Sequence, residues 1–195
     1  MEMLPAWQLQ PASFRTRLWL FLLAVVLPIG ITVGALALVA DDPAPKHLIG
    51  NSAWLTNVAV AIGLLTLCLI IHWIIARALR RHHVTLDGDG LGLATTFYTR
   101  KLDWNALQPQ QARVIDLDEQ TEFRPMLKTN GTGLPGFHSG WFRLRNRRKA
   151  LLAMAGGPRV LYLPTTLGYD LMLQPRQPQA LLLRLRELAP PHARR

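Results

Sequence analysis

Five basic side chains lie close together between residues 143 and 149, and they are the feature of this sequence best suited to binding chemistry. They are Arg143, Arg145, Arg147, Arg148 and Lys149. If a strand continues through this segment, alternation places Arg143, Arg145 and Arg147 on one face. Such a row suits anionic lipid headgroups, at about 1 kcal/mol for each basic group near an anionic leaflet, or an acidic protein partner. The alternative is a solvated surface that only satisfies the bias toward basic cytoplasmic segments.

Residue patterns typical of catalysis are missing from the sequence. It contains no Walker loop, dinucleotide-binding fingerprint, H-E-x-x-H motif or G-x-S-x-G motif. His138 and Ser139 are neighbours, but adjacent residues of a strand point to opposite faces, which disfavours a nucleophile and base pair. The sequence therefore predicts a protein that is not an enzyme and uses no cofactor.

Metal binding is disfavoured on similar grounds. Asp87-Gly88-Asp89-Gly90 carries two carboxylates but lacks the spacing and the final Glu of an EF-hand, and it is typical of a hairpin turn. His82 and His83 adjoin a basic segment without a further ligand cluster. Cys68 is the only cysteine, which excludes a disulfide within one chain and a zinc site built from cysteines. We therefore expect no metal site.

Two long apolar stretches precede the basic segment and indicate that the protein is anchored in a membrane. Residues 18–40 and 53–75 each run for 23 residues without Asp, Glu, Lys or Arg. As helices they are about 34 Å long, enough to cross a hydrocarbon core of about 30 Å. Since they contain no internal charge, an ion path is disfavoured, and we interpret them as a transmembrane hairpin that anchors the protein. Gly30 and Gly34 have the G-x-x-x-G spacing that lets helices approach closely, although glycine is also common in membrane helices.

Basic residues at the ends of these stretches predict their orientation. Arg15 and Arg17 precede the first stretch. Arg77, Arg80 and Arg81 follow the second and are further candidates for contact with lipid or a partner. The positive-inside rule places both termini in the cytoplasm, with residues 1–17 as a cytoplasmic tail and 41–52 as an external loop. A cleaved signal peptide is the rival interpretation, but the first stretch is longer than a usual signal core.

The remaining sequence has the pattern of one mainly-β domain. It covers residues 84–189, between a basic juxtamembrane linker at 76–83 and a basic tail at 190–195. Six or seven short β-prone runs are separated by turn signals, with a helical turn at 103–107 and a glycine-rich corner at 129–136. An amphipathic helix is predicted over 177–188. This order favours a small barrel or bent sandwich closed by the C-terminal helix.

Several local motifs in this domain form a familiar series. They are Asp89-Gly90-Leu91, residues 98–107, Gly133-Leu134-Pro135-Gly136-Phe137, Gly140-Trp141-Phe142, residues 149–152 and 160–165, and the closing helix after 173–175. Over residues 82–188 the sequence resembles the bacterial pleckstrin-homology-like (PH-like) domains, which often follow a pair of membrane helices. The resemblance implies a seven-stranded bent barrel capped by a C-terminal helix and used for binding, scaffolding or assembly. Phosphoinositide recognition is not implied, because the first turn, 87–90, is acidic.

The charge and the resemblance together indicate a binding protein. From residue 82 onward there are 16 basic and 9 acidic residues, a net charge of +7. Given the resemblance, we expect a non-enzymatic scaffold anchored in a bacterial inner membrane with both termini in the cytoplasm. Its cytoplasmic domain contacts a protein partner, a second copy of itself or anionic lipid headgroups. The alternative is an accessory or assembly subunit of a membrane enzyme or transporter, acting through its transmembrane helices. Nucleic acid is disfavoured because the basic segment lacks interleaved aromatic residues.

Overall fold

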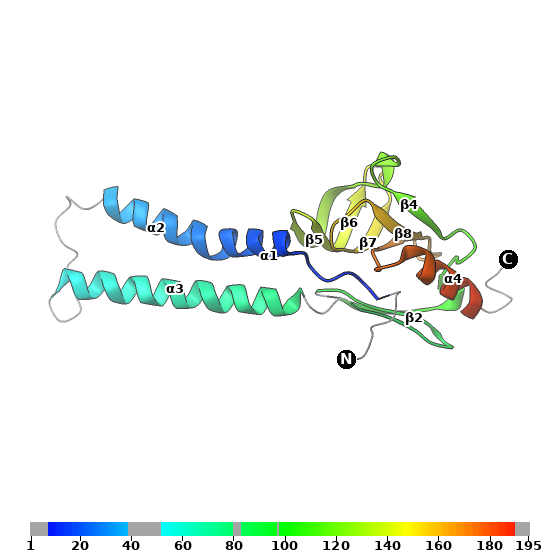
Figure 1. The fold of residues 1–195 in the computed structure, drawn as a ribbon, viewed down its shortest axis with the longest axis horizontal. Coiled ribbons are helices and arrows are strands. Elements are labelled where there is room, and N and C mark those ends of the chain that lie inside the picture. The colour runs from blue at the N-terminus through cyan, green and yellow to red at the C-terminus, as the bar shows by residue number, and fades with distance from the viewer. Residues whose placement is uncertain (1–7, 39–51, 80–82, 97, 190–195) are drawn as a thin grey trace. The chain divides into compact units, whose positions relative to one another are not determined.

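The computed structural model describes residues 8–38, 52–79, 83–96 and 98–189 (Figure 1). The chain divides into two compact units. A helical unit comprises Arg17–Arg77, and a β unit comprises Met1–Thr16 together with Ala78–Arg195. The expected order of two apolar helices, a mainly-β region and a C-terminal helix is therefore confirmed.

The helical unit contains two helices that are long and apolar enough to cross a membrane. The candidate spans are Phe14–Ala35 and Trp54–Ala78, with mean hydropathies of 2.4 and 2.6. Only 11% and 6% of their most apolar windows are buried. These two helices are therefore mostly exposed, whereas the core helix of a soluble protein is mostly buried.

The first span is built from three consecutive helical segments. These are α1 (Phe14–Phe21), the π-helical turn η1 (Leu22–Val26) and α2 (Leu27–Leu38). Pro28 has no N–H, and its ring crowds the preceding helical turn. The wider π turn directly before Pro28 reduces this crowding, and its i→i+5 hydrogen bond runs from Leu27 N to Leu22 O. The second span is α3 (Ala53–Ala78). Within this unit, the rings of Phe21 and His72 meet edge to face, with centroids 5.7 Å apart.

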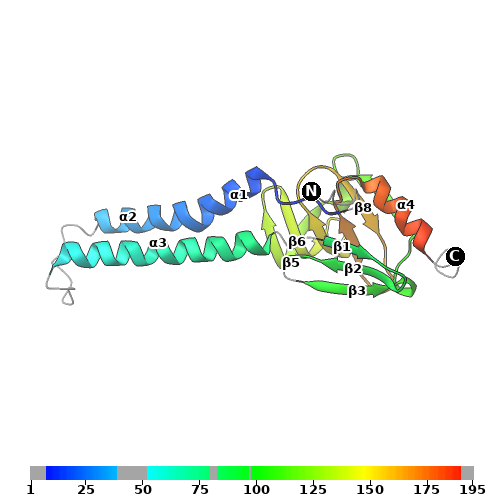
Figure 2. The same ribbon diagram turned by 60° about the horizontal axis from the view of Figure 1, so that its bottom comes forward.

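The β unit contains two sheets (Figures 1 and 2). The smaller is an antiparallel meander of β1 (His83–Leu86), β2 (Gly90–Ala94) and β3 (Thr99–Asp103). The larger has the order β4-β8-β9-β7-β6-β5, with β4 (Arg113–Asp116), β5 (Pro125–Leu134), β6 (Phe137–Leu144), β7 (Lys149–Met154), β8 (Arg159–Leu163) and β9 (Asp170–Leu173). Its strands pair antiparallel except for β7 and β9, which are parallel. The 3₁₀ turns η3 (Trp104–Ala106) and η4 (Thr121–Phe123) flank β4, and α4 (Pro178–Leu188) ends the unit.

Apolar side chains cover both faces of the larger sheet at β6–β9, whereas the residues of β5 are exposed or half-buried. One cluster joins this sheet to the smaller sheet and to α4, and it includes Leu93, Leu151, Leu171 and Leu185. A second cluster lies on the opposite face and includes Phe123, Phe142, Leu152, Tyr162 and Met172. Neighbouring residues of β7 enter different clusters because strand side chains alternate. A strand buried on both faces needs a continuous apolar run, and β7 has one in Ala150-Leu151-Leu152-Ala153-Met154.

Residues 8–16, which precede the apolar part of the first span, belong to the β unit. Gln8 Nε2 donates to Val84 O at 3.1 Å, and Arg176 N donates to Gln8 O at 2.9 Å. Leu9 is 5% exposed and lies in the first apolar cluster. This segment therefore connects the edge strand β1 to the residues that follow β9.

Two details of the expected β domain are wrong. The described residues form nine strands, whereas the sequence pattern predicted six or seven and the resemblance implied seven. Residues 129–136 were expected as a glycine-rich corner, but most of them belong to β5, and only Pro135 and Gly136 make the turn. Register shifts at Pro125/Leu127 and Lys128/Asn130 bend this strand, and Gly131 lies opposite Gly140, so the glycines permit close backbone approach within a ladder.

Candidate functional site

The basic segment forms the turn between β6 and β7. Strand β6 ends at Leu144, and Arg147 adopts a φ of 65° in the turn, where its N–H donates to Leu144 O at 2.9 Å. The side chain of Asn146 accepts a hydrogen bond from Arg148 N at 3.0 Å. The condition for one continuous row of Arg143, Arg145 and Arg147 is therefore not met, because the turn interrupts strand alternation before Arg147.

The five basic side chains at residues 143–149 differ in the contacts that they make. The side chains of Arg143, Arg145 and Arg147 are exposed, and the part of the chain described here offers them no acidic partner within 4.0 Å. Lys149 Nζ lies 4.5 Å from the centre of the Trp141 ring, a cation–π contact. Arg148 forms an ion pair, described below. We call Arg143, Arg145 and Arg147 the free arginines.

The basic residues beside the second span lie elsewhere in the chain. In the helical unit, the guanidinium of Arg77 lies 5.8 Å from the centre of the Trp73 ring, one turn away on the same helix. Arg80 and Arg81 fall outside the described residues. The structure therefore supplies geometry for only the first of these three candidates.

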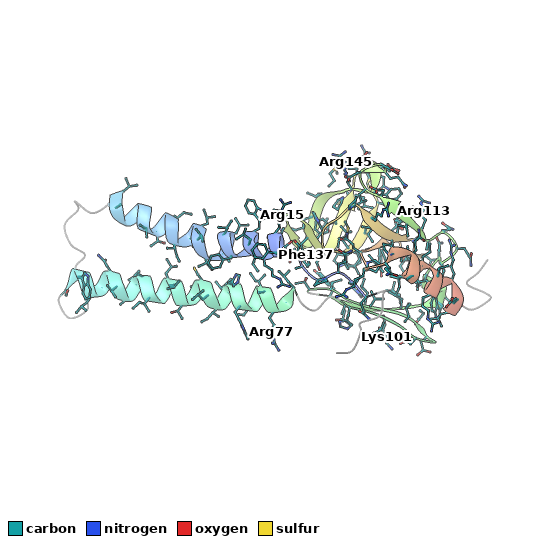
Figure 3. The ribbon with its side chains drawn as sticks, viewed as in Figure 1. Arg15, Arg77, Lys101, Arg113, Phe137 and Arg145 are labelled. Atoms are coloured by element: carbon teal, nitrogen blue, oxygen red, sulfur yellow. The ribbon has the colours of Figure 1, made fainter. Side chains whose placement is uncertain are left out.

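The turn that carries the free arginines lies at one end of β6, and Thr16 of the β unit contacts the turn at the other end. Thr16 Oγ1 donates to Pro135 O at 3.2 Å, in the turn that precedes β6. Figure 3 shows Phe137 and Arg145 at opposite ends of the strand. Eight strand residues extend about 25 Å at about 3.3 Å each. The free arginines are thus well separated from Thr16, the last residue of the β unit before the helical unit.

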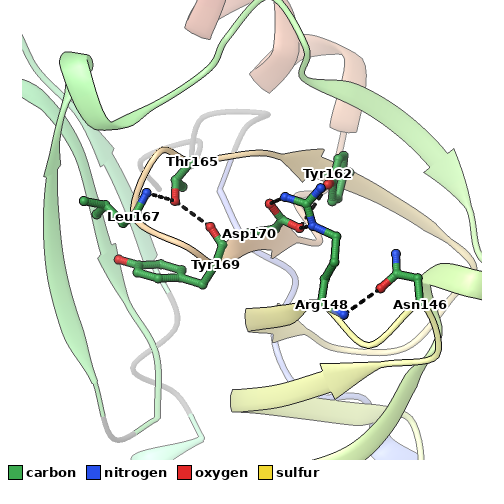
Figure 4. A network of polar contacts seen from close by, with 7 residues as sticks. All are labelled: Asn146, Arg148, Tyr162, Thr165, Leu167, Tyr169 and Asp170. Carbon is green, nitrogen blue, oxygen red and sulfur yellow. Dashed lines mark hydrogen bonds and ion pairs between the residues drawn. The ribbon is translucent and has the colours of Figure 1, made fainter.

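Arg148 holds a buried carboxylate (Figure 4). Its Nε and Nη2 lie 2.6 and 2.7 Å from Oδ2 and Oδ1 of Asp170, which has no exposed surface. The hydroxyl of Tyr162 donates to Asp170 Oδ2 at 3.0 Å. A buried carboxylate is costly unless it is paired and hydrogen-bonded, and these three contacts satisfy both requirements.

Tyr162 is held in its protonated form by this arrangement. Burial, followed by the charge of Asp170 and the hydrogen bond to it, raises the pKa of Tyr162 to about 12, against smaller lowering effects of Arg148 and Arg113. The phenol therefore remains a donor to Asp170 at neutral pH.

A pocket of about 240 Å³ lies beside this network. It is lined by Gln108, Gln111, Arg113, Phe123, Asn146, Arg148, Tyr162 and Pro164. The guanidinium of Arg113 lies 5.5 and 5.3 Å from the ring centres of Phe123 and Tyr162. These two rings contact each other edge to face at 4.8 Å, so Arg113 rests on a fixed aromatic support.

Sequence reasoning identified Arg148 and missed three other residues of this site. Arg113, Tyr162 and Asp170 are separated from it and from one another along the chain, and their proximity results from the pairing of β4 with β8 and of β8 with β9. One local signal was available, since Asp170 begins the otherwise apolar run Leu171-Met172-Leu173. An acid at the start of a buried strand needs a basic partner.

A larger cavity, of about 620 Å³, lies where α4 begins, but its buried polar group already has partners. Gln174 is 2% exposed, accepts a hydrogen bond from Ala155 N at 2.8 Å, and donates to Gly156 O and Gly157 O. Its amide joins the β7–β8 turn to the end of β9. We therefore assign Gln174 a structural role.

The remaining candidates for chemistry lie apart from the pocket. In β6, the ring of His138 packs against Phe142 at 5.5 Å and burial lowers its pKa, whereas Ser139 Oγ accepts a hydrogen bond from Thr96 N at 3.2 Å. Among the described residues, no three His, Cys, Asp or Glu side chains are grouped as a metal site. Asp87 Oδ1 instead accepts hydrogen bonds from Asp89 N and Gly90 N, which confirms the expected turn.

Comparisons of the chain with models of known families, with curated proteins and with solved structures found no match. The resemblance to PH-like domains rests on the sequence motifs quoted above.

Proposed function

We propose that this chain is a non-enzymatic, membrane-anchored scaffold of the PH-like type, which uses the free arginines to bind an acidic protein partner on the cytoplasmic side of a bacterial inner membrane. The observation that carries the proposal is the group of three exposed arginines at one hairpin, without an acidic partner among the described residues. Guanidinium groups pair well with carboxylates, and a basic patch steers an acidic partner toward the surface.

Membrane anchoring is supported by the apolar helices and by the composition of the β unit. The two candidate spans expose most of their apolar surface. Residues on both sides of the helical unit, 8–16 and 78–189, belong to one compact β unit. Two crossings return a chain to the side from which it started, so a hairpin of two spans is consistent with this shared unit. The flanking arginines favour the cytoplasm as that side.

Anionic lipid headgroups are the competing ligand for the free arginines, because guanidinium groups pair with phosphate as well as with carboxylate. The cross-linking experiment separates the two ligands by the nature of the cross-linked product.

Site-specific photo-cross-linking in native membranes tests the proposal. A photoreactive amino acid replaces Arg145 in the full chain, and Lys101, an exposed residue of β3, serves as the matched control position. We expect a protein adduct from position 145 whose cross-linked peptide is acidic by mass spectrometry. The adduct should decrease at least fivefold in 0.5 M salt or with R143E/R147E, because both weaken exposed charge pairs. Adducts to lipid alone, or equal yields from both positions, would contradict the proposal.

The accessory-subunit function is a second candidate, favoured by one feature of the first span. Side chains built onto Gly30 or Gly34 would meet no atom within 4 Å, so this face of α2 is open to another helix. Replacing both spans with unrelated apolar sequences while keeping residues 8–17 and 76–195 separates the two functions. The adduct from position 145 should persist for a scaffold acting through the β unit and disappear for a subunit acting through its spans.

A further inference from the structure

We infer that the pocket lined by Arg113, Tyr162 and Arg148 binds the carboxylate of a single acidic side chain, which is the specific anchor point of the partner. This inference rests on the proposed function for the origin of the ligand, and it adds a defined site and ligand chemistry. The hairpin's free arginines provide general attraction, whereas a lined pocket can select one group.

The inner part of the pocket is fixed before any ligand arrives. Asp170 is fully buried and receives contacts from Arg148 Nε, Arg148 Nη2 and the Tyr162 hydroxyl, at 2.6, 2.7 and 3.0 Å. Its oxygens are thus already paired within the protein. Arg148 is held by two contacts, which leaves its remaining N–H groups with a defined direction.

Two groups of the pocket lining are hydrogen-bond donors that can serve a ligand. Asn146 uses its carbonyl oxygen to accept from Arg148 N, so its NH₂ group is available as a donor. Arg113 adds a complete guanidinium that has no acidic partner among the residues the structure describes. Gln108 and Gln111 contribute side-chain amides, each of which can donate or accept. Acceptor oxygens on a ligand match Arg113 and the Asn146 amide.

The charge of the lining favours a monoanion. Asp170 neutralises Arg148, which leaves the charge of Arg113 uncompensated within the pocket. A carboxylate carries one negative charge, whereas a phosphomonoester carries about −1.5 to −2 at pH 7. Charge complementarity therefore selects the carboxylate over the phosphate.

The aromatic support orients Arg113 toward a planar group. Phe123 and Tyr162 lie against its guanidinium at 5.5 and 5.3 Å, which limits its rotation. A planar guanidinium with fixed orientation can present two parallel N–H groups to a carboxylate. A volume of about 240 Å³ accommodates an acidic side chain but is small for a larger organic cofactor.

The pocket is continuous with the proposed partner surface. Asn146 and Arg148 line it and also belong to the turn that carries Arg145 and Arg147. An acidic segment bound along this turn can therefore place one side chain into the pocket. Inorganic phosphate and lipid headgroups are the competing ligands that the experiment must exclude.

Peptide titration of the full chain in zwitterionic nanodiscs tests the inference. The probes are acetyl-Gly-Glu-Gly-amide, its Gln analogue and inorganic phosphate, followed by ligand-observed NMR. We expect the Glu peptide to bind in the millimolar range and the Gln peptide not to bind measurably. R113Q should weaken binding at least tenfold, while R159Q, an exposed arginine on β8 outside this pocket, should change it less than twofold. R113K, which keeps the charge without the guanidinium fork, should give an intermediate loss.

Three results would overturn the inference: equal binding of the Glu and Gln peptides, unchanged binding in R113Q, or tighter binding of phosphate than of the Glu peptide. Vesicles containing anionic lipid provide the last arm, and displacement of the Glu peptide by these vesicles would also overturn the inference. These outcomes are separate from the cross-linking test at position 145. If the adduct from position 145 persists at full yield in R113Q, the scaffold proposal stands and the pocket is not the anchor point of the partner. If the Glu peptide binds but position 145 gives no adduct, the pocket binds a carboxylate and the scaffold proposal fails.

Discussion

Arg148 and Asp170 form a two-point ion pair that connects the basic turn to the centre of the larger sheet. Arg148 lies two residues before Ala150, and Ala150 is paired with Asp170 in the parallel ladder of β7 and β9. The Asp170 side chain has no exposed surface, whereas that of Arg148 is 54% exposed. One partner is therefore rigidly held by the sheet, and the other extends from it toward the pocket. This geometry explains how a surface turn can have a defined conformation.

Breaking this ion pair should destabilise the β unit. R148M leaves the buried Asp170 carboxylate without its cation and should cost about 3 kcal/mol, the lower end for a broken buried pair because solvent reaches Arg148. The matched control R184M removes an exposed pair with Glu187 and should cost less than about 0.5 kcal/mol. Urea unfolding of the purified protein, followed by near-UV circular dichroism, measures both.

A double variant distinguishes the ion pair from general damage at the turn. Adding D170N to R148M removes the uncompensated charge and keeps an acceptor for Tyr162, so part of the lost stability should return. Two results would contradict this role of the ion pair. R148M would lower the free energy of unfolding no more than R184M does, or adding D170N to R148M would lower it further instead of restoring part of it.

The raised pKa of Tyr162 predicts a loss of stability in alkali. The unfolded protein ionises this phenol near pH 10, and the folded protein does so only at about pH 12. The stabilisation is therefore complete below pH 10 and declines as the pH rises from 10 to 12. Y162F should lack this part of the decline, and the difference between the two unfolding curves across that window measures it. Parallel curves for wild type and Y162F would contradict the assigned contact with Asp170.

Residues 8–16 should stabilise the strands of the β unit, which begin more than sixty residues later in the sequence. Leu9 is 5% exposed in the core cluster, so L9A should cost about 2–4 kcal/mol through lost burial and a residual cavity. L183A is the matched control, because Leu183 is 60% exposed on α4, and it should cost less than about 0.5 kcal/mol. Thermal unfolding of the full chain compares them, and equal effects would show that Leu9 is not part of the core.

The proposed topology makes a labelling prediction. In a C68S background, a single cysteine at Lys46, within the expected external loop, should react with a membrane-impermeant maleimide in intact cells. A cysteine at Lys128, an exposed residue of β5, should react only after the membrane is opened. Reaction at position 128 in intact cells would place the β unit outside and contradict the cytoplasmic assignment.

Features that depend on local residue chemistry could be predicted from the sequence. The turns at 87–90 and 156–158 are predictable from their Asp, Gly and Pro residues. Helix α4 is predictable from the helical spacing of its apolar residues, with Pro175 and Pro178 near its start and Pro190 after its end. The two apolar helices follow from composition alone. In each case the cause lies within a few residues, so a local pattern is sufficient.

Local patterns were insufficient for β5 and for Asp170. Glycine weakens a strand on its own, yet β5 forms because its ladder with β6 supplies the hydrogen bonds and Gly131 faces Gly140. The place of Asp170 before an apolar run indicates that it needs a basic partner, but only the parallel pairing of β7 and β9 identifies Arg148 as that partner.

The sequence by itself determined that the protein has two long apolar helices, a basic cluster at 143–149 and a mainly-β region ended by a helix, because hydropathy, charge and turn propensity are properties of neighbouring residues. Only the tertiary structure decided which of the basic side chains are free. It assigns Arg148 to Asp170 and Lys149 to Trp141, and it brings Arg113 onto Phe123 and Tyr162. These contacts join strands distant in sequence, and their energies depend on burial, which exists only once the sheets have packed.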